Sequence, residues 1–191
     1  MSRNGFNLAL MIPSWRLMPL AVLALSLMSP FHCVKASDGV ENAGDIVRTL
    51  IPAIAFGTTV YLRDSDGRSQ FYKSFFSNLA VTYALKQAVD KTRPNGKDDD
   101  SFPSGHTSVA FQGAAFIHKR YGLKYAIPAY VGASYVAWSR VDSDNHFTTD
   151  VLAGAAIGVV SSLIFTKPYK GISVTPLAGN RFYGISVSTQ W

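Results

Sequence analysis

His146 and Asp150 have the residue types and the spacing that an imidazole nucleophile needs. Two residues four apart on a helix lie on one face, one turn apart, so the carboxylate can accept the ring N–H. The other ring nitrogen then keeps its lone pair free to attack an electrophile. The same spacing also occurs in ordinary ion pairs at helix starts, so the pair indicates a nucleophile only if other site residues accompany it.

A second histidine, His106, opens an apolar helix in the stretch Pro103-Ser104-Gly105-His106. A helix start offers free backbone N–H groups and a favourable dipole to a phosphate oxygen. The Ser104 hydroxyl can add a donor, Gly105 lets backbone approach a ligand closely, and His106 can give or take a proton there. A capped helix with a packed histidine is the alternative interpretation.

Three cations accompany these histidines. Lys86 and Arg93 are seven residues apart, which predicts one helical face, and Pro94 predicts that Arg93 lies at the helix end. Arg140 precedes the polar loop that leads to His146. Taken alone, such cations are usually a solvated surface. Together with the two histidines they supply the parts of a metal-free phosphoryl-transfer site, because guanidinium groups match phosphate oxygens in two-point contacts.

These three segments resemble the three-part signature of the type 2 phosphatidic acid phosphatase (PAP2) and vanadium haloperoxidase superfamily, over about residues 69–165. The resemblance implies that Lys86, Arg93 and Arg140 bind phosphate oxygens and that Ser104 and the Gly105 amide complete the cradle. It implies that His146 attacks phosphorus, steadied by Asp150, that His106 protonates the leaving oxygen, and that water hydrolyses the phosphohistidine. It implies no metal and no cofactor. The connection between Pro94 and Pro103 is shorter than is usual in the family.

The elements that must position these residues are helices. Apolar stretches broken by turn-formers predict helices at 45–62, 69–92, 104–121, 123–140 and 147–165, with the polar stretch 37–44 before them. The fold class is therefore all-α, a bundle of about five core helices over residues 37–170, with a short β-hairpin at 171–191. The uncharged runs are shorter than the roughly 20 residues of a membrane span, which favours a water-soluble bundle.

Residues 1–36 have the parts of a secretory signal peptide: Arg3 and Arg16, an apolar run at 17–28, and a cleavage-like Val34-Lys35-Ala36. We therefore expect export to the periplasm or cell envelope, with an uncleaved inner-membrane anchor as the alternative. Removal of this segment lowers the formal charge from +6 to +3, and we expect no nucleic-acid partner. The only cysteine, Cys33, would leave with the segment.

We expect an exported phosphatase that hydrolyses phosphomonoesters or pyrophosphates, with a lipid-linked substrate and peripheral contact with a membrane. Aromatic residues of the second helix provide a candidate acyl groove, although core packing explains them equally well: Phe71, Tyr72, Phe75, Phe76 and Tyr83. The run Asp98-Asp99-Asp100 is expected to be a solvated acidic loop rather than a metal site. The alternatives are a soluble non-specific acid phosphatase, a vanadium-dependent haloperoxidase and a non-catalytic envelope binding protein.

Overall fold

A computed structural model describes residues 8–11, 36–169, 173–179 and 182–188. The chain divides into two compact units, one of residues 33–168 and one formed by the two ends of the chain. The first unit is helical and the second contains the strands. Most of the predicted signal peptide lies outside the described residues and stays a prediction.

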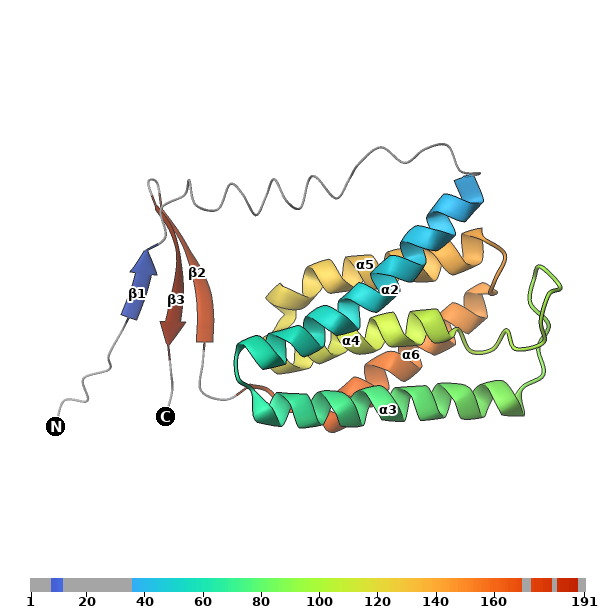
Figure 1. The fold of residues 1–191 in the computed structure, drawn as a ribbon, viewed down its shortest axis with the longest axis horizontal. Helices are drawn as coiled ribbons and strands as arrows, with labels where there is room; N and C mark the ends of the chain where they lie inside the picture. Colours follow the sequence, from blue (N-terminus) through green and yellow to red (C-terminus); the bar gives the residue numbers. More distant parts are fainter. Residues whose placement is uncertain (1–7, 12–35, 170–172, 180–181, 189–191) are drawn as a thin grey trace. The chain divides into compact units, whose positions relative to one another are not determined.

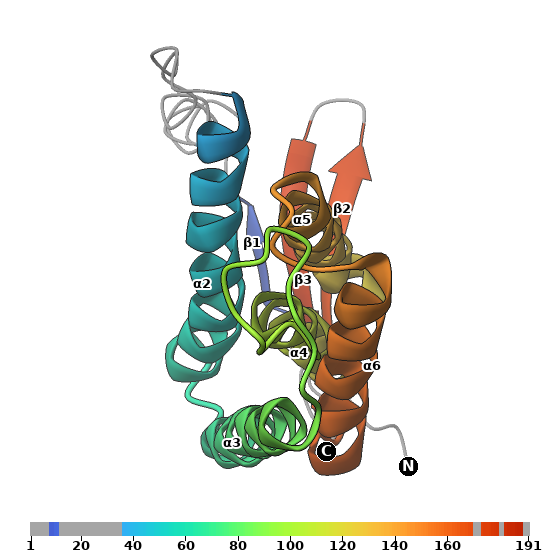
Figure 2. The same cartoon turned by 90° about the vertical axis from the view of Figure 1, so that its right-hand side faces the viewer.

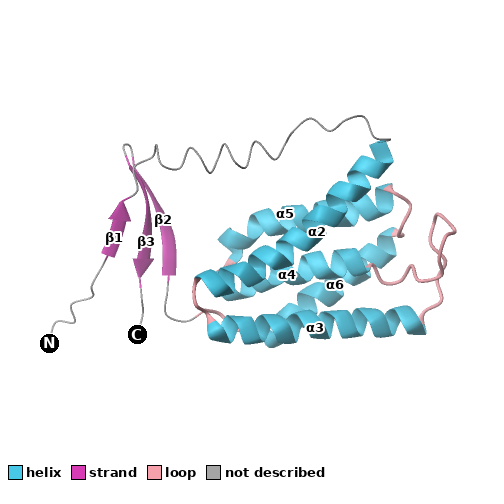
Figure 3. Ribbon diagram, in the orientation of Figure 1, coloured by secondary structure: helices cyan, strands magenta, loops and turns pink. Residues whose placement is uncertain are grey.

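The helical unit consists of α2 (Ala36–Tyr61), α3 (Ser65–Ala88), α4 (Gly105–Tyr121), α5 (Leu123–Asp142) and α6 (Thr148–Phe165). These are the five predicted core helices (Figure 1). Their directions alternate, so the loops lie at two ends of the bundle (Figure 3). The loops 89–104 and 143–147 share one end, onto which Figure 2 looks, and we call it the catalytic end.

Three predicted helix limits are wrong by four residues or more, and one of them is the start of the second helix, which lies at Ser65 rather than at residue 69. The first helix begins at Ala36 rather than at residue 45, because polar residues do not stop a helix and Glu41 is held by Arg140 of α5. The second helix ends at Ala88 rather than at residue 92. Val89 is extended, and the Lys91 amide donates to the Asp99 carbonyl at 3.1 Å, so residues after Ala88 pair with the loop instead of continuing the helix.

Helix α4 packs against all four other helices of the unit. Its apolar contacts form two clusters, one around Ala110, Ala114 and Val136, the other around Phe71 and Phe116. Its approach to α6 depends on Gly154, where an added Cβ would lie 2.4 Å from the carbonyl oxygen of Ser104. This close contact fixes the first turn of α4.

The interior of the bundle is also strongly polar. The Thr82 hydroxyl donates to Ser108 at 3.1 Å, and Gln112 donates to Ser74 at 2.9 Å. The Ser162 hydroxyl of α6 donates to the Gln112 carbonyl at 2.7 Å. Hydrogen bonding offsets the cost of burying these groups and ties α3, α4 and α6 together.

The second unit contains β1 (Leu8–Met11), β2 (Ser173–Gly179) and β3 (Phe182–Ser188) in the order β1-β3-β2. Strands β2 and β3 pair antiparallel, with Ser173 opposite Ser188 and Gly179 opposite Phe182. This is the pairing of a hairpin, and its turn residues lie outside the described part. Strand β1 was not predicted, because its four residues fall inside the expected signal segment.

Candidate active site

The two histidines and two of the three cations line one cavity of about 510 Å³. It lies between α2, α3 and α4, and residues from the loops of the catalytic end also line it. Of the predicted site residues, the cavity is lined by Lys86, Arg93, Gly105, His106 and His146. Residues from three segments far apart in the sequence therefore converge, whereas Ser104, Arg140 and Asp150 lie behind the cavity wall.

His146 is 3% exposed, and its Nδ1 lies 2.7 Å from the carbonyl oxygen of Ser101. A carbonyl only accepts, so Nδ1 carries the proton and the lone pair is on Nε2. Burial lowers the pKa of His146 to about 4. The Ser101 carbonyl opposes this shift, Arg93 and Lys86 add to it, and Asp150 opposes it. The ring is therefore neutral near pH 7, as attack on phosphorus requires.

Asp150 supports His146 through Ser101 instead of directly. The prediction that its carboxylate accepts the ring N–H is wrong, because Oδ2 lies 3.9 Å from Nδ1. Oδ2 accepts from the Ser101 hydroxyl at 2.6 Å and from the Phe147 amide at 3.0 Å, and Oδ1 accepts from Lys91 Nζ at 2.5 Å. The fully buried carboxylate thus fixes the segment that holds the ring.

Lys86 and Arg93 meet at Asp100 and not along a helical face. Lys86 is in the last turn of α3, and Arg93 is in the loop beyond it. Arg93 donates two hydrogen bonds to Asp100 Oδ1, at 2.9 and 2.6 Å, and Lys86 Nζ lies 3.5 Å from Oδ2. Asp100 is therefore an ion-pair partner and not a solvated acid as predicted. Among the described residues, no three His, Cys, Asp or Glu side chains form a metal-binding group.

The start of α4 provides backbone groups to the cavity, and Ser104 caps the helix. The Ser104 hydroxyl is fully buried and accepts from the Thr107 hydroxyl at 3.1 Å. It faces its own helix, which differs from the expected donor role. Gly105 lies beside Lys86, because a Cβ added to it would lie 3.9 Å from Lys86 Cε.

Arg140 is 3% exposed and is held by α2. Its Nη2 donates to the Glu41 carbonyl at 2.7 Å, and its Nη1 lies 3.1 Å from Asp45 Oδ1. The same Asp45 oxygen lies 3.0 Å from His106 Nε2. Burial lowers the pKa of His106 to about 4. Arg48 and Arg140 add to this shift, Asp45 opposes it, and His146 adds a smaller contribution.

Sequence reasoning missed four residues around the site. Ser101 and Lys91 connect to Asp150, whereas Asp45 and Arg48 reach the site from α2. No spacing rule joins Asp45 and Arg48 to the three segments. The one available signal was that Lys91 lies within the first segment and Ser101 stands two residues before the second.

The family model of the PAP2 superfamily matches residues 69–171, which is more than half of the chain. The chain therefore belongs to the PAP2 superfamily, and the family predicted from the three segments is confirmed. The lipid A 1-phosphatase of Porphyromonas gingivalis is 37% identical over 121 residues, which are 53% of this chain and 27% of that protein. The lipid A 4'-phosphatase of Helicobacter pylori is 29% identical over 170 residues, which are 79% of this chain and 85% of that protein.

A solved structure shares the fold. The crystal structure of Aquifex aeolicus LpxE aligns over 72% of this chain and 96% of that chain, with a TM-score of 0.51 and 19% identity. At this identity the likeness concerns the fold alone. It confirms the predicted five-helix PAP2 bundle.

Proposed function

We propose that the protein is a metal-independent phosphatase that removes a phosphate from a lipid-linked phosphomonoester or pyrophosphate at the cell envelope, through a phosphohistidine on His146. The observation that carries this proposal is the His146 ring, with Nδ1 fixed on Ser101 and Nε2 free, in one cavity with Lys86, Arg93 and His106. The names of the relatives, both lipid A phosphatases, support the class of substrate.

In the first half of the reaction, Lys86 and Arg93 exchange Asp100 for the non-bridging oxygens of the phosphoryl group. The lone pair on His146 Nε2 then forms a bond to phosphorus. Without substrate, a pKa of about 4 leaves His106 neutral near pH 7, and the negative charge of the bound phosphoryl group favours its protonated form. The bond from phosphorus to the leaving oxygen breaks, its electron pair stays on that oxygen, and the protonated His106 gives the oxygen a proton. Positioning and charge stabilisation provide most of the rate in such transfers.

In the second half, water attacks the phosphohistidine. Neutral His106 takes a proton from that water, the bond from Nε2 to phosphorus breaks, and inorganic phosphate leaves. His146 returns to its neutral form and His106 to its protonated form. Throughout, the Ser101 carbonyl keeps the other ring nitrogen of His146 protonated and the ring in place.

A groove for an apolar chain adjoins the cavity. It is a second cavity of about 300 Å³ between α2 and α3, with an almost entirely apolar lining that includes Phe56, Phe71 and Phe76. Pro52 and Phe75 line both cavities, so the two are adjacent. A lipid chain lying in the groove would place its phosphate among Lys86, Arg93 and the histidines. Tyr83, which the sequence also suggested for the groove, lines neither cavity.

The outer surface of the bundle supports contact with a membrane. Large apolar side chains are exposed on α2, α3, α5 and α6, while polar ones are buried between the helices. Patches of this kind mark membrane or protein contacts. Within the described residues, α6 is the one helix long and apolar enough to cross a membrane. This distribution favours membrane contact over the water-soluble bundle expected from the short uncharged runs.

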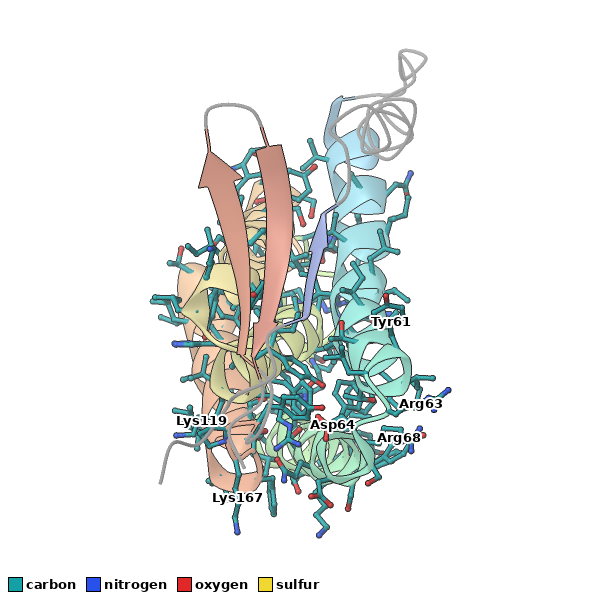
Figure 4. All side chains as sticks on the ribbon, turned by 90° about the vertical axis from the view of Figure 1, so that its left-hand side faces the viewer. Tyr61, Arg63, Asp64, Arg68, Lys119 and Lys167 are labelled. Carbon is teal, nitrogen blue, oxygen red and sulfur yellow. The ribbon has the colours of Figure 1, made fainter. Side chains whose placement is uncertain are left out.

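The end of the bundle opposite the catalytic end is basic. Arg63, Arg68, Lys119 and Lys167 lie there around Asp64 (Figure 4). Clusters of basic residues are attracted to anionic lipid surfaces. This end of the bundle therefore also supports contact with a membrane surface.

The proposal is tested with purified protein and a panel of a lipid phosphate, a polyprenyl pyrophosphate and a water-soluble phosphate ester, each with a chelator present. We expect phosphate release that is fastest for a lipid-linked substrate, is inhibited by vanadate, and is abolished by His146→Ala. Rapid quenching with ³²P-labelled substrate should trap an acid-labile, base-stable phosphoprotein in the wild type only. Loss of activity with the chelator, or full activity of His146→Ala, would overturn the proposal.

A further inference from the structure

One carboxylate oxygen from outside the three site segments lies between His106 and Arg140. It is Asp45 Oδ1 of α2, 3.0 Å from His106 Nε2 and 3.1 Å from Arg140 Nη1. The side chain is 46% exposed, but Oδ1 itself is buried and has no aligned hydrogen-bond donor. The interaction is therefore mainly Coulombic, and it is strengthened by the low exposure of its surroundings.

The sequence before Asp45 builds this placement. Gly44 is buried, and a Cβ added to it would lie 2.2 Å from Ser139 Oγ, so only a residue without a side chain allows α2 to come this close to α5. One turn earlier, the Glu41 carbonyl accepts from Arg140 and its carboxylate accepts from Asn145 at 2.8 Å. The contacts of Gly44 and Glu41 with α5 and Asn145 therefore hold Asp45 at the site.

The charges that face His106 explain what Asp45 can do there. Arg48 of α2, Arg140 of α5 and His146 of the following loop all disfavour the imidazolium, as burial does, while Asp45 favours it. A proton donor must hold its proton when the leaving oxygen separates. Asp45 is the carboxylate that contacts His106, at 3.0 Å, and it favours the imidazolium.

We propose that Asp45 is a positioning residue that orients His106 and stabilises its imidazolium for donation to the leaving oxygen; this rests on the proposed function. The proton passes from His106 to the oxygen as its bond to phosphorus breaks, and the proton taken from water restores the imidazolium beside Asp45. Helix α2, which precedes the residues matched by the family model, thereby contributes to the chemistry.

The test compares Asp45→Asn with Glu41→Gln. Both remove a carboxylate near Arg140, but of the two only Asp45 contacts His106. For Asp45→Asn we expect kcat/KM to fall about tenfold with an alkyl phosphate and less than about twofold with p-nitrophenyl phosphate, whose leaving group needs no proton. The alkaline limb of the pH profile should move about one pH unit toward acid. Asp45→Glu, which keeps the charge, should recover most of the loss.

Glu41→Gln should leave the alkaline limb in place. Equal losses on the two leaving groups, or an unmoved limb in Asp45→Asn, would overturn the inference. Far-UV circular dichroism checks that each variant is folded.

A second measurement does not depend on activity. The imidazole of His106 is titrated by NMR in the wild type and in Asp45→Asn, with His106→Gln used to assign its signal. We expect the pKa of His106 to be lower in Asp45→Asn, and an unchanged titration would contradict the inference. If the titration shifts but the wild type hydrolyses no phosphate ester, the proposed function fails while the coupling between Asp45 and His106 stands.

Discussion

Ser101 joins Asp150 to His146, the proposed nucleophile: its hydroxyl donates to Asp150 Oδ2 at 2.6 Å, and its carbonyl accepts from His146 Nδ1 at 2.7 Å. One residue thus uses its side chain toward the carboxylate and its backbone toward the ring. Asp150 orients the ring by holding the backbone that holds it. The hydroxyl of Ser101 therefore affects the position of the His146 ring without contacting it.

Ser101→Ala should lower kcat about tenfold with little change in KM, because a hydrogen bond to a charged group contributes about 1.5 to 3 kcal/mol and part of it is expressed in the transition state. The Ser101 carbonyl remains in this variant, so the His146 ring keeps its hydrogen-bond partner. The backbone that carries this carbonyl is held less firmly, so the ring is positioned less precisely. Asp150→Asn should cost more, since it also leaves Lys91 without its carboxylate. Steady-state kinetics on a soluble ester checks both. A kcat of Ser101→Ala equal to that of the wild type would contradict the link.

Stability should fall as the pH is lowered from about 6.5 to about 4. His106 and His146 both have pKa values of about 4 in the folded protein, lowered from 6.5 chiefly by burial. Between these values the unfolded chain binds more protons, so acid favours unfolding, by about 3 kcal/mol for the deeply buried His146. Below about 4 the loss continues by another route, because the pKa values of Asp64 and Asp100 are held low by their cationic partners, which outweigh burial.

Thermal unfolding at a series of pH values tests this expectation. The variant His146→Gln, which does not titrate, should show a shallower decline of Tm between pH 6.5 and 4 than the wild type. Parallel declines in the two proteins would mean that His146 is not kept neutral by the fold.

Asp100→Asn should tighten the binding of phosphate. In the structure Asp100 forms ion pairs with Lys86 and Arg93, so an incoming phosphate must displace its carboxylate to reach them. Removing this charge should lower both KM and the inhibition constant of inorganic phosphate about fivefold, as expected for the loss of a partly exposed competing ion pair. Inhibition kinetics gives the two constants. Asp98→Asn is the matched control, because Asp98 is 62% exposed and 3.7 Å from Arg93, and weaker phosphate binding in Asp100→Asn would refute the idea.

Phe75→Ala should separate lipid substrates from soluble ones. Phe75 lines both the catalytic cavity and the apolar groove, so its loss should lower kcat/KM for a long-chain lipid phosphate about tenfold or more. The rate on a soluble ester should change little, which also reports that the variant is folded. Tyr83→Ala is the control, since Tyr83 is on the same helix, 66% exposed and lines neither cavity. Equal losses of kcat/KM on both kinds of substrate would show that the groove does not bind the lipid chain.

The sequence predicted the helices well where the local pattern decides the structure. Apolar runs ended by glycine or acidic loops located five helices, and the three segments named Lys86, Arg93, His106 and His146, which line one cavity. The failures share one cause. Asp150 pairs with Lys91 and Ser101, Arg93 with Asp100, and Arg140 with Glu41 and Asp45, and each partner is chosen by tertiary contact. A buried charge must find an opposite charge, but spacing along the chain does not say which one.

The contact at Gly154 has a consequence for how the enzyme accommodates its substrate. There α6 meets the backbone of Ser104 with no side chain between, and the Ser104 amide donates to the Asp150 carbonyl at 3.0 Å. The starts of α4 and α6 are thus fastened backbone to backbone, so the two imidazoles belong to a single rigid frame. A Cβ added to Gly113 of α4 would lie 3.0 Å from the backbone nitrogen of Pro52, so α2 is also held close to this frame. Any widening of the entrance for a bulky headgroup has to come from α3, which meets α4 through side-chain hydrogen bonds.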